Sequence, residues 1–118
     1  MELVKRKLTK KTKAVIVPHM FGYPANIPAI ERLGIPVIED CAHATGAEYK
    51  GRKVGNYGDL AFYSSEESKV FNTVQGGMAA ANETRLAGRL AEFFDRAPLP
   101  PEPPAPPRLA HPAVPDRR

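Results

Sequence analysis

The chain has 118 residues, of which 42% are hydrophobic and 25% are charged, as in an ordinary globular protein that forms one domain. Its single cysteine excludes an internal disulfide bond and cannot form a zinc site alone. No apolar run approaches the ~18 residues of a membrane span, and no secretory signal follows the basic start, so we expect a cytoplasmic protein without membrane contact.

The net charge of +4 comes mainly from residues 1–13, which we treat as a separate basic segment. Its cations are Lys5, Arg6, Lys7, Lys10, Lys11 and Lys13. No aromatic residue alternates with them to stack on bases, so we predict a solvated segment and no nucleic-acid binding.

Residues 14–96 alternate strand and helix signals. The β-branched run at residues 14–17 predicts a buried strand that Pro18 ends, and residues 36–41 predict a second strand. A strand, helix, strand order with short loops indicates a parallel pair.

The intervening helix is predicted from Ile27 to Leu33. Asn26 is suited to cap its N-terminus, Pro28 lies in its first turn, and Gly34 suits the position after its end. Its apolar residues share one face, which we expect to pack on the sheet.

Further strands are predicted at residues 60–64 and 77–81, after a stretch that is rich in glycine. A last helix is predicted to begin at Asn82 as its N-cap. It carries a stripe that we expect to be buried, formed by Leu86, Leu90, Phe93 and Phe94. These elements together predict an α/β fold with a mostly parallel sheet.

Residues 97–118 are dense in proline and predict a disordered tail without helix or inner strand. The alternative is a ligand for an SH3-type groove, because Pro98, Pro101 and Pro104 have PxxP spacing.

Asp40 is the first candidate for chemistry, because it ends an apolar strand, and open parallel sheets bind ligands beyond the carboxyl ends of their strands. Strand alternation sends the neighbouring Glu39 to the opposite face. An acid at this place could pair with the protonated ring nitrogen of a pyridine cofactor, which thereby accepts electrons. The alternative is a cap or a structural salt bridge.

Lys69 follows the strand at residues 60–64 through a polar loop, where a lysine could form a Schiff base or could simply be solvated. Serines such as Ser64 could bind phosphate or cap turns. His43 could lie against a ring or serve a structural role. Cys41 and His43 together supply too few ligands for a metal site, so we predict none.

Five motifs in one order resemble the DegT/DnrJ/StrS-type sugar aminotransferases, which are pyridoxal-phosphate enzymes of fold-type I. They are residues 11–22 (KTKAVIVPHMFG), 37–47 (VIEDCAHATGA), 51–59 (GRKVGNYGD), 62–69 (FYSSEESK) and 76–82 (GGMAAAN). The resemblance implies that residues 14–96 form an incomplete large domain of this fold.

The resemblance also implies the roles of four residues. Asp40 would pair with the pyridine nitrogen, His43 would contact the cofactor ring or its phenolic oxygen, Ser64 would bind phosphate, and Lys69 would hold the cofactor covalently. A lysine at position 69 favours amino transfer, because relatives with histidine there resemble dehydratases.

The implied parent reaction moves an amino group from glutamate or glutamine to a keto-sugar nucleotide, in an enzyme that forms a homodimer. The family also has an N-terminal portion and a C-terminal small domain that these residues lack, so we expect a fragment that is inactive alone. The alternative is a non-catalytic remnant, or an interaction protein that uses its proline-rich tail.

Overall fold

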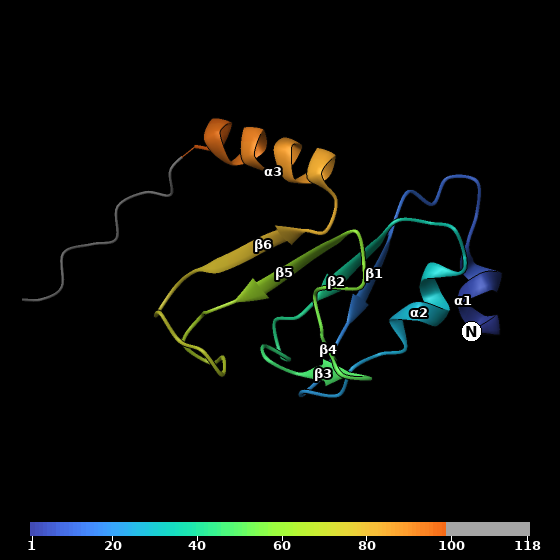
Figure 1. The fold of residues 1–118 in the computed structure, drawn as a ribbon, viewed down its shortest axis with the longest axis horizontal. Helices are drawn as coiled ribbons and strands as arrows, with labels where there is room; N and C mark the ends of the chain where they lie inside the picture. Colours follow the sequence, from blue (N-terminus) through green and yellow to red (C-terminus); the bar gives the residue numbers. More distant parts are fainter. Residues whose placement is uncertain (99–118) are drawn as a thin grey trace, which may run out of the picture.

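The computed structural model describes residues 1–98, and the predictions for the proline-rich tail lie outside them except at residues 97 and 98 (Figure 1). The elements in chain order are α1 (Glu2–Lys7), β1 (Val15–Pro18), α2 (Ile27–Glu31), β2 (Val37–Asp40), β3 (Glu48–Tyr49), β4 (Arg52–Lys53), β5 (Leu60–Ser64), β6 (Gly77–Ala81) and α3 (Thr84–Arg96). None of the described helices is long and apolar enough to span a bilayer.

The main sheet has the strand order β1-β2-β5-β6. The first three strands are parallel, and β6 runs antiparallel to β5. The predicted α/β fold with a mostly parallel sheet is therefore confirmed. Because β1, β2 and β5 run in one direction, the loops that follow them meet at one edge of the sheet.

Helix α2 covers one face of β1 and β2. Asn26 caps it as predicted, since its Oδ1 accepts a hydrogen bond of 3.3 Å from the Ala29 amide. Ile27 is fully buried against Val17 and Val37, and these residues form one half of the core. The helix ends at Glu31, two residues earlier than predicted, and continues as turns.

The other half of the core lies beneath the small β3–β4 hairpin. It consists of Cys41, Ala44, Val54 and Ala61, with Tyr63 packed against it. Gly55 lets the chain pass this tyrosine, because a Cβ atom at Gly55 would lie 1.8 Å from the Tyr63 hydroxyl oxygen. The glycine-rich stretch thus contains a second, two-stranded sheet that the sequence did not predict.

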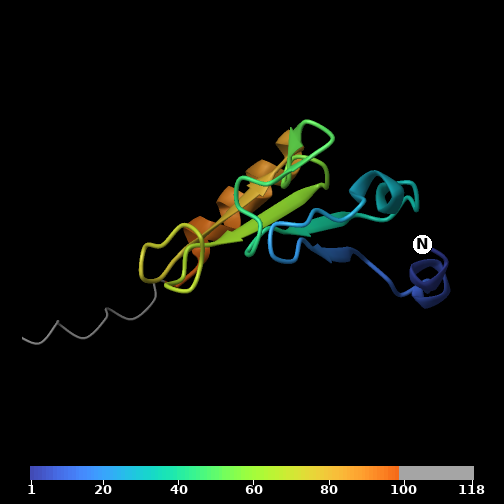
Figure 2. The ribbon, with the colours of Figure 1, turned by 90° about the horizontal axis from the view of Figure 1, so that it is seen from below.

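The basic segment contains α1, a short helix that was not predicted. None of its residues is buried, and it lies apart from the sheet at one end of the molecule (Figure 2). Exposure agrees with the prediction of a solvated segment.

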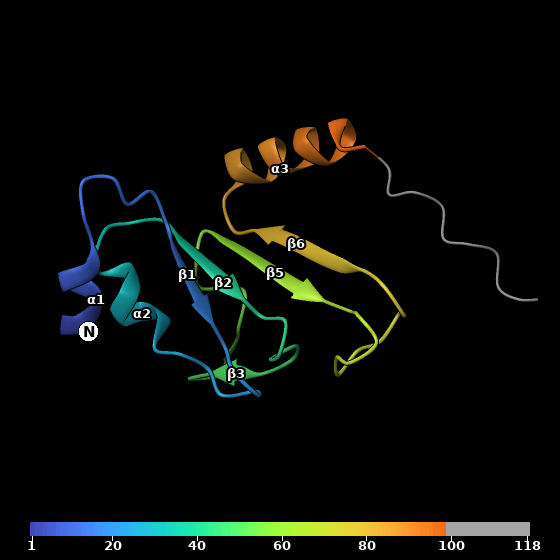
Figure 3. The same cartoon turned by 180° about the vertical axis from the view of Figure 1, so that it is seen from behind.

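Helix α3 corrects two predictions. Its N-cap is Glu83, because the Asn82 side chain donates instead to the carbonyl oxygens of Gly55 and Gly58, at 3.1 and 2.6 Å. The helix lies along β6, at the opposite edge of the sheet from β1 (Figure 3). Phe93 and Phe94 remain 72% and 78% exposed, so the prediction that they are buried is wrong.

Candidate active site

A hollow of about 310 Å³ opens where the loops after β1, β2 and β5 meet. Phe21 comes from the first loop, His43 from the second, and Ser68 and Lys69 from the third. Sequence positions up to 48 residues apart are therefore brought together by the parallel strands. This is the edge at which open α/β sheets bind ligands.

His43 and Lys69 form the direct contact of the hollow. The Lys69 Nζ lies 3.3 Å from the His43 Nε2. A charged ammonium group has only hydrogens to offer, so in that state Nε2 is the acceptor and the imidazole proton lies on Nδ1. A turn closed by the Lys69 amide and the Glu66 carbonyl, at 2.9 Å, sets the direction of the lysine.

Asp40 ends β2, where it lies between Pro18 of β1 and Phe62 of β5. Its Oδ1 accepts a hydrogen bond of 3.0 Å from the Ala42 amide, which fixes the carboxylate. Its Oδ2 accepts none from residues 1–98, and no ion pair within that range involves Asp40. The local turn that was considered as the alternative is present, yet one oxygen stays available for a ligand.

Ser64 ends β5 on the same sheet face as Asp40, because Asp40 lies beside Phe62 and side chains alternate along a strand. Its Oγ accepts a long hydrogen bond of 3.4 Å from the Glu66 amide. The hydroxyl hydrogen therefore remains free to bond an anion.

The four predicted site residues thus all follow or end the carboxyl ends of β2 and β5. Only His43 and Lys69 touch one another directly; within residues 1–98 neither Asp40 nor Ser64 hydrogen-bonds either of them. Their shared role as ligands of one cofactor stays a prediction.

Ser65 and Thr73 close the loop that carries Lys69. Their hydroxyl oxygens lie 2.7 Å apart, and the Ser65 amide donates to the Gly76 carbonyl at 3.0 Å. Ser65 is buried, so this serine holds the loop and is not presented to a ligand. The sequence left open which serines bind and which cap turns, and burial separates Ser65 from Ser64.

Sequence reasoning missed a buried pair on the opposite face, formed by His19 and Glu39. The His19 Nε2 lies 3.0 Å from the Glu39 Oε2, and both side chains are fully buried. His19 Nδ1 accepts from the Ala25 amide at 3.1 Å, so in the neutral ring Nε2 carries the proton and donates to Glu39.

Three backbone amides complete the bonding of Glu39. Those of Gly55, Tyr57 and Gly58 donate to its two oxygens at 2.8, 2.8 and 2.7 Å. A charged residue within an apolar strand was the available signal, since buried carboxylates need partners. Glu39 and its donors hold the glycine loop against β2, the strand that ends in Asp40.

His19, Glu39 and Cys41 also lie together, with ligand atoms within 4.8 Å of one another. A metal ion does not suit them as they stand, because the nitrogen and oxygen atoms are already hydrogen-bonded. Burial, and secondarily the charge of Glu39, raises the pKa of the Cys41 thiol to about 12, which keeps it protonated.

Comparison with known proteins identifies the family of the chain. Residues 1–96 match the model of the DegT/DnrJ/EryC1/StrS aminotransferase family. The chain belongs to this family. This match confirms the resemblance deduced from the five sequence motifs. Enzymes of the family depend on pyridoxal phosphate.

Two curated relatives illustrate the similarity. The L-glutamine:2-deoxy-scyllo-inosose aminotransferase of Streptoalloteichus tenebrarius is 41% identical over 108 residues, which cover 82% of this chain and 26% of that protein. The GDP-perosamine synthase of Escherichia coli O157:H7 is 38% identical over 94 residues, which cover 76% of this chain and 26% of that protein.

Among solved structures, the aminotransferase from Psychrobacter cryohalolentis matches with a TM-score of 0.76 and 36% identity. The match covers 80% of this chain and 25% of that one. The chain therefore spans about a quarter of the length of these relatives.

Proposed function

We propose that this chain carries the cofactor-binding centre of a pyridoxal-phosphate-dependent sugar aminotransferase, with Lys69 as the lysine that holds the cofactor. The observation that supports this most directly is the Lys69 amine, 3.3 Å from His43 at the carboxyl edge of a family-type sheet.

The residues present fit the cofactor. The free Oδ2 of Asp40 can accept a hydrogen bond from a protonated pyridine nitrogen, which an acid beside a pyridine ring favours. The Ser64 hydroxyl can donate to a phosphate oxygen. When bound, the cofactor supplies an electron-withdrawing ring for the electrons that stay behind when the carbon atom of the amino donor loses its proton.

Lys69 has two tasks in this proposal. Its neutral amine attaches the cofactor, and once released it can accept and return the proton of the substrate carbon. The His43 Nε2 lies where it can hold the lysine in position between these tasks. The closed turn between Glu66 and Lys69 reduces the number of conformations that the amine must give up on reacting.

The names of two relatives support a proposal for the substrate class. One is named as an L-glutamine-dependent aminotransferase and another as a GDP-perosamine synthase. We propose glutamate or glutamine as amino donor and a keto-sugar, carried on a nucleotide, as acceptor.

We further propose that the 118-residue chain alone turns over little substrate. His43 is exposed, and the relatives are about three times as long. Binding groups that orient a substrate supply much of an enzyme's rate, so an open site loses activity. In the parent enzyme we expect a homodimer to complete the site.

The test is to incubate the purified chain with pyridoxal phosphate, reduce with borohydride and map the modified lysine by peptide mass spectrometry. We expect Lys69 to be the principal site, and Lys69→Arg to abolish it. Lys53→Arg is the matched control, because Lys53 is an exposed lysine outside the hollow that pairs with Glu48. Equal labelling of Lys53 and Lys69 would refute the assignment.

A second variant tests Asp40. Asp40→Asn should weaken cofactor binding about tenfold or more, because the amide cannot stabilise a protonated ring nitrogen with its charge. Glu31→Gln, on the exposed side of α2, should leave binding unchanged.

A further inference from the structure

The loop after β1 turns back sharply at Phe21 and Gly22. The Tyr23 amide donates to the Met20 carbonyl at 2.9 Å, and these two residues form an isolated antiparallel bridge. Phe21 and Gly22 both have positive φ, 51° and 79°, as the two central residues of a type I′ turn do.

Phenylalanine is an unfavourable residue at this position. The first central position of a type I′ turn prefers asparagine, aspartate or glycine, and a bulky side chain with positive φ is strained. Such strain persists where something else requires the residue, and it is frequent at ligand sites.

The fold itself makes little use of the Phe21 ring. The residue is 75% exposed, and its aromatic neighbour is the exposed His43, with ring centroids 5.6 Å apart in an edge arrangement. The Gly22 amide donates a hydrogen bond to the His43 carbonyl at 2.9 Å, so the turn is held next to His43 while the Phe21 ring stays in solvent.

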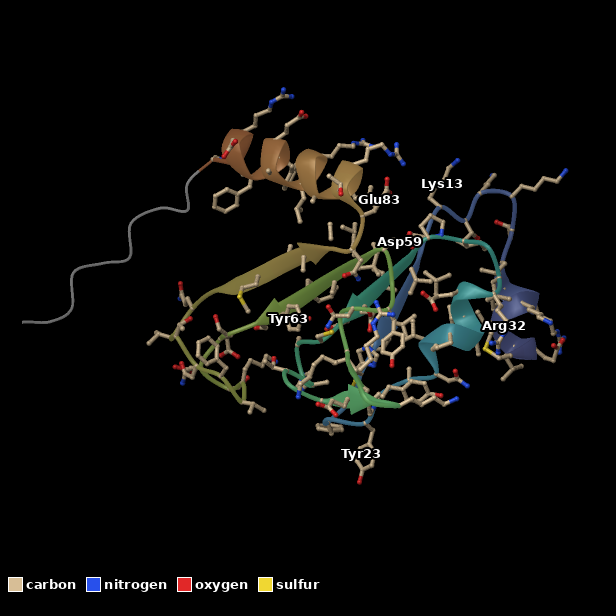
Figure 4. All side chains as sticks on the ribbon, viewed as in Figure 1. Lys13, Tyr23, Arg32, Asp59, Tyr63 and Glu83 are labelled. Carbon is tan, nitrogen blue, oxygen red and sulfur yellow. The ribbon has the colours of Figure 1, made fainter. Side chains whose placement is uncertain are left out.

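The ring lines the same hollow as Lys69 and His43. Tyr23, in the same turn, is also exposed at 81%, but it does not line the hollow and points away from the sheet (Figure 4). Phe21 is thus the aromatic residue of this turn that can meet a molecule bound at Lys69.

We propose that Phe21 is a ligand-contacting residue of this site, whose ring packs against the planar ring of the molecule that reacts with the Lys69 amine. The inference rests on the proposed function, because the ligand is taken to be pyridoxal phosphate. Aromatic contacts of this kind contribute beyond their buried area and require a flat partner. The strain of the turn is maintained because the ligand needs the ring.

The hairpin between β3 and β4 provides a matched control. Lys50 and Gly51 have φ of 49° and 78°, nearly the values of Phe21 and Gly22, in a turn outside the hollow. Phe21→Asn and Lys50→Asn each place the preferred residue in an equivalent turn. We expect both variants to melt at a temperature equal to the parent's or up to about 5 °C above it.

Ligand binding should separate the two variants. The probe is pyridoxal phosphate, whose aldehyde carbon bonds the Lys69 nitrogen with loss of one water, and the bound fraction is read from absorbance. We expect Phe21→Asn to raise the apparent Kd about fivefold or more, and Lys50→Asn to leave it unchanged. Phe21→Tyr, which keeps a ring, should restore binding.

A small aldehyde without a ring, glyoxylate, should react equally with the parent chain and Phe21→Asn, because it has no face to pack on Phe21. Equal affinity of the parent chain and Phe21→Asn for pyridoxal phosphate would overturn the inference and leave the proposed function intact. If the parent chain took up no pyridoxal phosphate at Lys69, the proposed function and the inference would both fail.

Discussion

At the scale of single residues, two adjacent carboxylates of β2 have opposite surroundings. Glu39 is fully buried and accepts four hydrogen bonds, whereas Asp40, at the carboxyl end of β2, keeps one oxygen that accepts no hydrogen bond from residues 1–98. Strand alternation alone sends them to different faces, so one residue of the pair anchors the structure and the other is the proposed ligand group.

Replacing Glu39 by alanine should be strongly destabilising. His19 and three backbone amides would lose their acceptor in the interior, and breaking such a buried network costs about 3–5 kcal/mol. Urea unfolding followed by circular dichroism measures the loss. Glu31→Ala, on the exposed side of α2, should stay within about 0.5 kcal/mol of the parent. A similar small change in both variants would contradict the role of Glu39.

The raised pKa of the buried Cys41 thiol should make the protein less stable in alkaline solution. Burial raises the pKa of its thiol from 9.0 to about 12, and burial is also the main cause of the raised pKa of Tyr63. Below about pH 9 the Cys41 thiol is protonated in both the folded and the unfolded chain, so its contribution to stability is fully present there. As pH rises further the unfolded thiol ionises first, so the free energy of unfolding falls by up to about 1.4 kcal/mol per pH unit for this group.

The measurement is urea unfolding of the parent chain and Cys41→Ala between pH 8 and pH 10.5. The alanine variant should show a smaller fall with pH, and the part that remains is assigned to Tyr63 and other groups. Identical slopes in the two proteins would show that the thiol does not contribute.

At the scale of elements, α2 depends on its cap. Asn26→Ala removes the acceptor for the Ala29 amide and should cost about 1 kcal/mol, measured by urea unfolding. Asn26→Ser should recover most of the loss, because serine is an equally good cap. Equal free energies of unfolding for Asn26→Ala and Asn26→Ser would contradict a capping role for this side chain.

The positions of the four main strands along the chain, and the residues at their carboxyl ends, could be predicted from the sequence, because strand and cap signals act locally. The 48–53 hairpin could not, since its two-residue strands are too short for periodicity to register. The start of α3 was misplaced because a long-range bond from Asn82 to the glycine loop competed with local capping.

The site was predicted in part. Asp40, His43, Ser64 and Lys69 stand at one sheet edge because parallel strands bring their ends together. The proposed contribution of Phe21 was inferred from the positive φ of this residue, and composition and motif spacing do not reveal a backbone angle. The cytoplasmic location expected from the sequence stays a prediction.

At the scale of the whole molecule, apolar side chains remain uncovered between α3 and β6. A hollow of about 850 Å³ there is lined by Met78, Leu90, Phe93 and Phe94, among others. Such apolar surface promotes association in water. The relatives, which are about three times as long, have further chain with which to cover the corresponding surface.

The double variant Phe93→Gln, Phe94→Gln should reduce self-association and the binding of an apolar fluorescent dye about twofold, because it replaces exposed aromatic surface. The free energy of unfolding should change by less than about 0.5 kcal/mol. Light scattering and dye fluorescence are the measurements. Leu3→Gln, which is 76% exposed on α1, is the control and should alter neither. A large loss of stability in the double variant would mean that these rings belong to the core.

The four donors of Glu39 also determine how the chain opens. They come from two segments, position 19 in the loop after β1 and positions 55, 57 and 58 in the loop before β5. Neither segment can move away without removing hydrogen-bond donors from the buried Glu39 carboxylate. The two segments should therefore open in a single cooperative event. The amide hydrogens of Gly55, Tyr57 and Gly58 should then exchange with deuterium at the slow rate of global unfolding, while those of α1 exchange within seconds to minutes by fraying.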